Sequence, residues 1–246
     1  MLEGLKDALQ YANSLKEQSM DVKVTEIAGK TYCNKELYRY GKEELATAIH
    51  ASTLSSVVDY ITNKSEELRE SMILHITDPR TVKLYSGLLA EKRREYLFES
   101  EAVVNEFQFD KWYDQERFLI ELQANFALND DLQTIMKVAG NIKSGTTANY
   151  SDDGISQKTT IQAGVQRSDV IVPNPVTLVP YRTFPEIKQP QSQYVFRIRD
   201  TGGEPDFKLV EADNGLWKHE AMKEIKYYFE FELGDDLEKL NITVIA

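Results

Sequence analysis

The segment that most constrains the structure of this chain reads Val172-Pro-Asn-Pro-Val-Thr-Leu-Val-Pro-Tyr-Arg-Thr-Phe-Pro-Glu-Ile-Lys-Gln-Pro-Gln191. It contains five of the seven prolines, yet it is apolar and aromatic rather than low in complexity. Proline fixes φ, removes a backbone donor and holds the preceding residue in extended geometry. A flexible linker is instead rich in glycine, serine or charge. We therefore predict a pinned, extended ribbon that crosses the surface of a core.

Around this ribbon, predicted strands and helices alternate in blocks without the regularity of βαβ units. This pattern is typical of an α+β fold, here with mixed, mainly antiparallel sheets and several packed helices. A chain of 246 residues with 41% hydrophobic content buries a sizeable core as one large domain or two small ones. We expect a single α+β chain over 1–246. The alternative is two subdomains, a helix, hairpin and helix part (1–140) and a β-rich part with the ribbon (141–246).

Local signals place the individual elements. Leu2, Leu5, Leu9, Ala12 and Leu15 form a helical stripe, and the sequence then alternates as two short strands around Ala28-Gly29. Thr53 is a candidate N-cap. Further elements are predicted as a hairpin at Asp78-Pro79-Arg80, helices from Asp114 and from Asn129 or Asp130, strands at 155–161, 193–199 and 241–245, and a helix at 216–229.

Charge and cysteine content limit the cellular compartments and the classes of partner that we expect. A net charge of −11 argues against a general nucleic-acid-binding surface, because such surfaces neutralise phosphates with Lys and Arg. No apolar run approaches the ~18 residues of a membrane span, so we expect no membrane association. The single cysteine, Cys33, excludes an internal disulfide and suits a reducing cytosol, and we expect it to pack beside Tyr32. We therefore expect a cytoplasmic protein.

Catalytic and cofactor motifs were sought in the sequence. His50, His75 and His219 lack the spacing of metal ligands, so we predict no metal site. The stretch from Gly140 to Gly145 resembles a P-loop in its glycine spacing but lacks the lysine that holds the phosphates. We expect no bound cofactor, and the sequence assigns no catalytic residue.

Two arginines are the strongest candidates for ligand binding. Arg182 and Arg197 lie in apolar extended segments, where a guanidinium must pair or hydrogen-bond. Structural anchoring to Glu186 or Asp200 is favoured over an anionic ligand. A second candidate is the acidic pair Asp152 and Asp153, whose carboxylates suit a divalent ion, although a hairpin turn at this position explains them equally well.

Aromatic side chains suggest an interaction surface. Tyrosine and tryptophan combine apolar area with a polar tip, which suits interfaces and also the edges of cores. The candidates for an interface are Tyr181, Phe184, Trp112 and Trp217.

Several short motifs carry a resemblance to a known family. They are Asp152-Asp-Gly154, Val172-Pro-Asn-Pro-Val176, Pro180-Tyr-Arg-Thr-Phe184, Gln189-Pro190, Tyr194-Val-Phe-Arg197 and Asp213-Asn-Gly-Leu-Trp217. With weaker echoes from residue 50 onward, the chain resembles the YfdQ-like family of phage- and prophage-encoded proteins of unknown function. The resemblance implies a phage accessory protein in the cytoplasm of a bacterial host, and it carries over no catalytic residues.

The leading hypothesis is a non-enzymatic phage or prophage protein that binds a host or phage protein or forms a homo-oligomer. A self-assembling, capsid-like shell is the structural alternative, by fold-level analogy. A nucleotide-binding or sequestering protein, or an enzyme with an unrecognised site, is the third, with Arg182 and Arg197 near a pocket. A DNA mimic is the fourth, and it requires acidic side chains aligned on one face.

Overall fold

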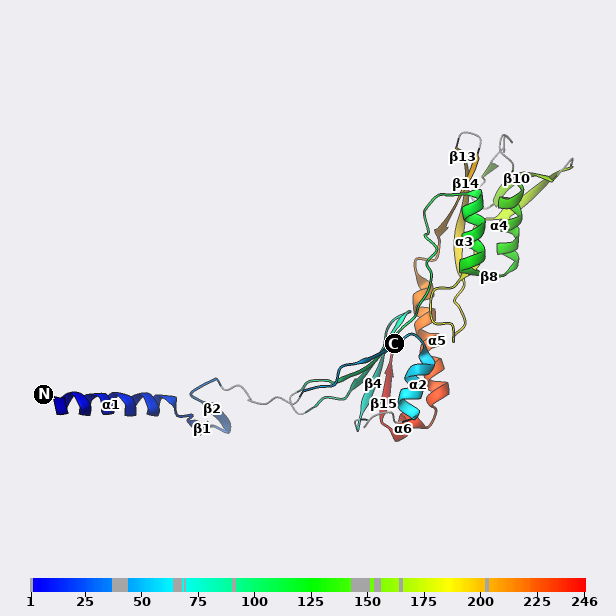
Figure 1. Ribbon diagram of the computed structural model, residues 1–246. Helices are drawn as coiled ribbons and strands as arrows, with labels where there is room; N and C mark the ends of the chain where they lie inside the picture. The colour runs from blue at the N-terminus through cyan, green and yellow to red at the C-terminus, as the bar shows by residue number, and fades with distance from the viewer. Residues whose placement is uncertain are drawn as a thin grey trace. The chain divides into compact units, whose positions relative to one another are not determined.

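A computed structural model describes residues 2–36, 44–63, 68, 70–89, 92–142, 151–152, 156–163, 166–201 and 204–246. The chain divides into two compact units, Met1–Glu44 and Leu45–Ala246 (Figure 1). Helices and mostly antiparallel sheets make up the chain, which confirms the predicted α+β class.

The first unit is a helix followed by a hairpin. Its elements are α1 (Leu2–Met20), β1 (Val24–Ile27) and β2 (Lys30–Cys33). The hairpin turn is Ala28-Gly29, with φ values of 51° and 74°. Two-residue loops with positive φ at both positions match the right-handed twist of paired strands, so this turn sets the antiparallel register. The predicted helix and the two predicted strands are therefore present.

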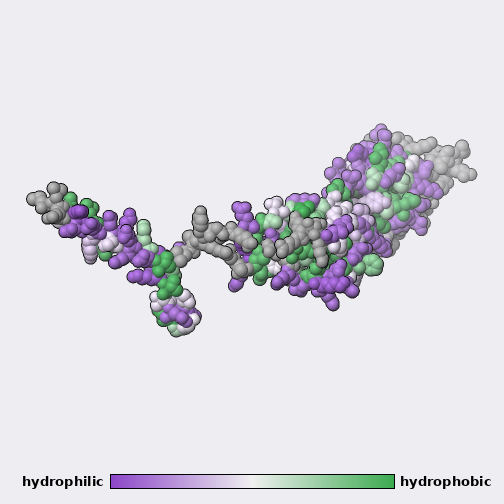
Figure 2. All heavy atoms as spheres, turned by 60° about the horizontal axis from the view of Figure 1, so that its bottom comes forward, coloured by the Kyte–Doolittle hydropathy of each residue, from purple (hydrophilic) through white to green (hydrophobic). Residues whose placement is uncertain are grey.

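Among the described residues of this unit, the apolar side chains do not form a core. Leu5 and Leu9 of the predicted helical stripe expose 62% and 59% of their surface. Valine, isoleucine and tyrosine side chains of the hairpin are exposed as well, and Figure 2 shows hydrophobic surface over this part of the chain. Cys33 is also exposed, so the expectation that it packs is wrong. The sequence pattern identified the helix correctly, but it does not tell where the apolar face is buried.

The second unit contains two hydrophobic cores. The first core lies between a five-stranded sheet, ordered β15-β4-β5-β6-β3, and helices α2 and α5 (Figure 1). Its elements are β3 (Ile49–Ala51), α2 (Leu54–Thr62), β4 (Met72–Asp78), β5 (Thr81–Ser86), β6 (Tyr96–Glu101), α5 (Leu216–Leu233), α6 (Asp236–Lys239) and β15 (Ile242–Ile245). The predicted hairpin at Pro79 and Arg80 joins β4 to β5, and alternate residues of both strands are buried.

The second core lies between another five-stranded sheet, β7-β14-β13-β12-β8, and helices α3 and α4. Its elements are β7 (Tyr113–Asp114), α3 (Gln115–Asn125), β8 (Phe126–Ala127), α4 (Asp130–Asn141), β12 (Val176–Pro180), β13 (Ser192–Thr201) and β14 (Glu204–Glu211). Stacked aromatic rings fill it: Phe118 lies 5.9 Å from Phe196 and 5.2 Å from Phe207, centroid to centroid. Such stacking adds to the large area that each ring buries.

A separate three-stranded sheet connects to the second core. It is ordered β11-β10-β9, with β9 (Ser151–Asp152), β10 (Ser156–Ala163) and β11 (Gln166–Pro173). The strand predicted from the Asp-Asp-Gly turn corresponds to β10, paired over its whole length with β11. Each of the two larger cores takes residues from both sides of residue 140.

The proline-rich segment runs through both cores. Residues 176–180 form β12, which pairs with β13 on one side and β8 on the other. Val176 and Leu178 are fully buried in the second core, whereas Phe184 and Ile187 are buried in the first. The segment is extended as predicted only in its first part, because a loop with a turn at 185–187 follows β12, and it does not cross the surface of a core. Its buried residues are divided between two cores. The segment's own sequence could not predict this division, because both cores are built mainly from elements far away in the chain.

We expect Phe118→Ala to lower the free energy of unfolding by about 3–5 kcal/mol, because it leaves a cavity in the aromatic stack. The matched control is Ile120→Ala on the same helix, whose side chain is half exposed and whose loss should cost about 0.5 kcal/mol or less. Urea unfolding followed by circular dichroism measures both. Equal losses for the two variants would contradict the position of the core.

Candidate functional site

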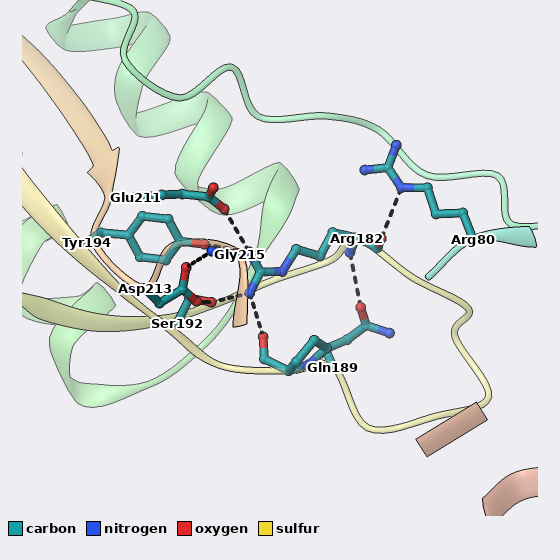
Figure 3. A network of polar contacts seen from close by, with 9 residues as sticks. Arg80, Arg182, Gln189, Ser192, Tyr194, Glu211, Asp213 and Gly215 are labelled. Carbon is teal, nitrogen blue, oxygen red and sulfur yellow. Dashed lines mark hydrogen bonds and ion pairs between the residues drawn. The ribbon is translucent and has the colours of Figure 1, made fainter. Parts of the chain in front are cut away.

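Arg182 sits at the junction of the two cores, immediately after β12. Its backbone is held by the side chain of Gln189, whose Oε1 accepts hydrogen bonds from the N–H groups of Arg182 (3.0 Å) and Thr183 (3.3 Å). The Gln189 amide in turn donates to the carbonyl of Phe184 at 2.8 Å. One glutamine thus closes the loop from residue 182 to residue 189, and this closure fixes where the arginine points (Figure 3).

The guanidinium of Arg182 is buried, with 4% of the residue exposed. Nη1 donates to Tyr194 Oη at 2.9 Å and to Glu211 Oε1 at 3.0 Å. Nη2 donates to the carbonyl of Pro190 at 3.3 Å and to Ser192 Oγ. Figure 3 shows these groups converging from the proline-rich segment, β13 and β14. We call Arg182, Ser192, Tyr194, Glu211 and Asp213 the arginine cluster.

The arginine cluster extends to α5. The Arg182 guanidinium lies over the Trp217 ring, 3.9 Å from its centroid. Asp213 accepts a hydrogen bond from Ser192 and one from the N–H of Gly215 (3.1 Å), just before α5 begins. Such cation–π stacking is stronger where water is excluded. The arginine therefore fixes the N-terminal end of α5 against β13 and the proline-rich segment.

Burial sets the electrostatics of the cluster. It lowers the pKa of the Arg182 guanidinium, and the neighbouring Tyr194, Glu211 and Asp213 oppose that shift. Burial also raises the pKa of the Tyr194 hydroxyl. Two buried donors, Arg182 Nε and Trp217 Nε1, have no hydrogen-bond partner among the described residues. Because the carboxylates balance the guanidinium charge, the cluster is suited to hold structure rather than to bind a free anion.

Contacts from the same segment reach the other core. The carbonyl of Arg182 accepts a hydrogen bond from Arg80 Nε at 3.1 Å, and the Thr183 hydroxyl donates to the carbonyl of Pro79. Glu186 Oε1 accepts from the N–H of Leu54 at 2.8 Å, at the start of α2. The expected anchoring of Arg182 is present, but its carboxylate partner is Glu211 on β14. Glu186 instead caps a helix.

The other candidate ligand residues lie elsewhere. Arg197 is on β13, directly opposite Lys208 of β14, whereas Tyr194, which contacts Arg182, lies on the other face of β13. Asp152 belongs to β9, and Asp153 lies outside the described residues. The structure therefore does not bring Arg197 into the arginine cluster.

Two of the four aromatic residues expected at an interface are internal. Phe184 is fully buried in the first core, and Trp217 is buried beneath Arg182. Trp112 is half buried, with the Arg199 guanidinium 4.3 Å and Lys208 Nζ 5.0 Å from its ring centroid. Tyr181 is 47% exposed. Phe184 and Trp217 are therefore not available at an interface, because segments distant in the sequence pack over both side chains.

Beside the arginine cluster, a groove runs between α5 and residues 188–193. It consists of two hollows that share Gln191 and Glu220 as lining residues. One hollow, of about 400 Å³, contains Asp213, Leu216 and Trp217 in its lining. The other, of about 240 Å³, is lined by Lys188, Gln189, Pro190, Gln191, Glu220, Lys223, Glu224 and Tyr227. We call these two hollows together the α5 groove.

Sequence reasoning missed the α5 groove, because its two walls lie far apart in the chain. Phe231, one helical turn beyond Tyr227, is 83% exposed. Flanking charges give no signal for this exposure, because Ile225, which stands between Glu224 and Lys226 on the same helix, is fully buried.

No group of three or more His, Cys, Asp or Glu side chains that could hold a metal ion occurs in the part of the chain that the structure describes. Among the described helices, none combines the length and hydrophobicity required to span a bilayer. Comparison with protein-family models, curated proteins and solved structures gave no significant match.

We expect Arg182→Met to lower the free energy of unfolding by about 2–3 kcal/mol. Breaking a fully buried ion pair costs about 3–5 kcal/mol, and the one-third exposure of Glu211 reduces that figure. The matched control is Arg199→Met, which removes a more exposed pair with Asp206 and should cost about 1 kcal/mol or less. Chemical denaturation of the full chain measures both losses. A loss for Arg182→Met no larger than that of the control would contradict the structural role.

Proposed function

We propose that this chain is a phage- or prophage-encoded protein that acts by protein–protein association, and that it associates with copies of itself. One observation carries the proposal: nine large apolar side chains in the described part of the first unit are exposed. They are Leu5, Leu9, Tyr11, Leu15, Met20, Val22, Val24, Ile27 and Tyr32. We call this unit, through residue 36, the arm.

The arm has too little structure of its own to stay folded. A helix in a protein takes most of its stability from the packing of its apolar face, and an isolated two-stranded hairpin is marginal in water. Chains of about 40 residues seldom bury enough surface to be stable alone. Each leucine that a partner covers contributes about 1.5–3 kcal/mol. The arm therefore gains stability when another surface covers its apolar side, and this favours an association role.

Self-association is the simplest form of this role, because every copy of the chain carries both the arm and a large second unit. The proposed setting is the cytoplasm of a bacterial host. It is supported by the resemblance of the Val172–Val176 and Pro180–Phe184 motifs to YfdQ-like phage proteins and by the single cysteine. A host or phage protein remains the alternative partner under the same proposal.

Native mass spectrometry of the untagged full-length protein tests this proposal. We expect a discrete oligomer for the wild type and a shift toward the 28.2 kDa monomer for Leu9→Glu, which places a charge on the apolar side of α1. The matched control is Gln10→Glu, which adds the same charge on the polar side of α1 and should leave the oligomer intact. Urea unfolding checks that both variants keep the stability of residues 45–246, because the arm itself should lose helix content when Leu9→Glu dissociates the oligomer.

A wild-type protein that stays monomeric up to about 100 μM, without a co-purifying protein, would overturn the proposal. Equal effects of Leu9→Glu and Gln10→Glu would also count against the arm, because charge alone would then explain the shift. A mass in the range of a closed shell would extend the same association to a particle.

A further inference from the structure

The outward face of α5 carries exposed apolar residues at both ends and charged residues in the middle. Trp217, Ala221, Ile225 and Phe229 are buried on the opposite side of the helix. The outward stripe is Leu216, Glu220, Lys223, Glu224, Tyr227 and Phe231. Most of these residues also form the helical wall of the α5 groove. Leu216, Tyr227 and Phe231 are each more than half exposed, which is a large apolar area for a helix surface.

The exposed face of α1 carries a stripe with the same spacing. Its residues are Leu5, Leu9, Ala12, Lys16 and Met20, at i, i+4, i+7, i+11 and i+15. Such positions lie on one face of an α-helix. Fifteen positions separate Leu5 from Met20, and fifteen separate Leu216 from Phe231. At a rise of 1.5 Å per residue, each stripe is about 22 Å long.

We propose that α1 of one copy docks antiparallel along α5 of a second copy, over the α5 groove. The inference rests on the proposed self-association and names its contact surface. In this orientation Leu5 meets Phe231, Leu9 meets Tyr227, Ala12 meets Lys223 and Glu224, Lys16 meets Glu220, and Met20 meets Leu216. Every apolar residue of the α1 stripe except Ala12 then faces an apolar residue of α5.

The charges support this orientation. Lys16 is the one charged residue of the α1 stripe, and it lies opposite Glu220, with Asp213 lining the same half of the groove. Ala12, the smallest residue of the stripe, lies opposite the two charged side chains in the middle of α5. A parallel orientation would place Lys16 against Tyr227 and leave Glu220 beside Leu9. Charge complementarity therefore selects the antiparallel arrangement.

Each stripe is uncovered within its own unit. Leu5 and Leu9 of α1 and Tyr227 and Phe231 of α5 all keep more than half of their surface accessible. The groove is assigned to a second copy because the proposed self-association supplies an α1 from that copy. An α1 that folded back onto its own α5 would leave the protein monomeric. Helix-in-groove contacts of this kind use apolar anchors at i, i+3, i+4 and i+7.

The first test measures the dissociation constant of the full-length oligomer by sedimentation equilibrium. Phe231→Glu should weaken self-association about tenfold or more, because it places a charge opposite Leu5 at an apolar anchor. Ile120→Glu is the matched control, since Ile120 is a half-exposed apolar residue on α3. It should leave the dissociation constant unchanged within about twofold.

The second test is a charge exchange. Lys16→Glu should weaken self-association about three- to tenfold, because two carboxylates then face each other. Adding Glu220→Lys should restore the wild-type dissociation constant. The control pair is Lys6→Glu with Glu220→Lys. Lys6 lies one residue away from Leu5, off the stripe. Lys6→Glu should therefore not offset the weakening that Glu220→Lys causes by placing a lysine opposite Lys16.

The outcomes separate the two proposals. If Leu9→Glu dissociates the oligomer but Phe231→Glu behaves like Ile120→Glu, the α5 surface is wrong while arm-mediated self-association stands. If Phe231→Glu weakens the oligomer but the charge exchange restores nothing, the antiparallel alignment is overturned. A wild-type monomer overturns both the self-association and its contact surface. Specific rescue by the exchange supports this alignment.

Discussion

The buried guanidinium of Arg182 is the constraint on which the second unit depends. A charge at 4% exposure is tolerated only where its hydrogen bonds and its countercharge are supplied. Here they come from the proline-rich segment, β13, β14 and the residues just before α5. Satisfying one side chain therefore fixes four parts of the chain relative to one another. The α5 groove exists because this arrangement holds residues 188–193 beside the helix.

Local signals in the sequence predicted much of the fold. Ala28-Gly29 forms the expected hairpin turn, Thr53 caps α2, and Pro79 and Arg80 join β4 to β5. Each depends on the backbone preferences of a few neighbouring residues. Helical spacing also identified α1, and the helix predicted over 216–229 corresponds to most of α5. These predictions needed no knowledge of which segments meet in space.

The candidate site could not be predicted in the same way. The partner of Arg182 is Glu211, which a hairpin brings back from 29 residues away, while the nearer Glu186 is used to cap α2. Phe184 is an aromatic residue of a type that is common at interfaces, but it is fully buried in a core. Conversely, Leu5, Leu9 and Leu15 of α1 have a core pattern, yet they are exposed. A periodic pattern identifies the apolar face of a helix, but it does not show which other segment, if any, covers that face.

The sharing of one segment between two cores also determines how the second unit unfolds. Leu178 belongs to one core and Phe184 to the other, and only five residues separate them in sequence. Opening either core pulls on β12 and on the loop that Gln189 closes, so neither core can be lost while the other keeps its full set of contacts. Such linkage merges what would otherwise be two independently melting subdomains into one cooperative unit. The proline-rich segment thus makes the stability of residues 45–246 a single quantity.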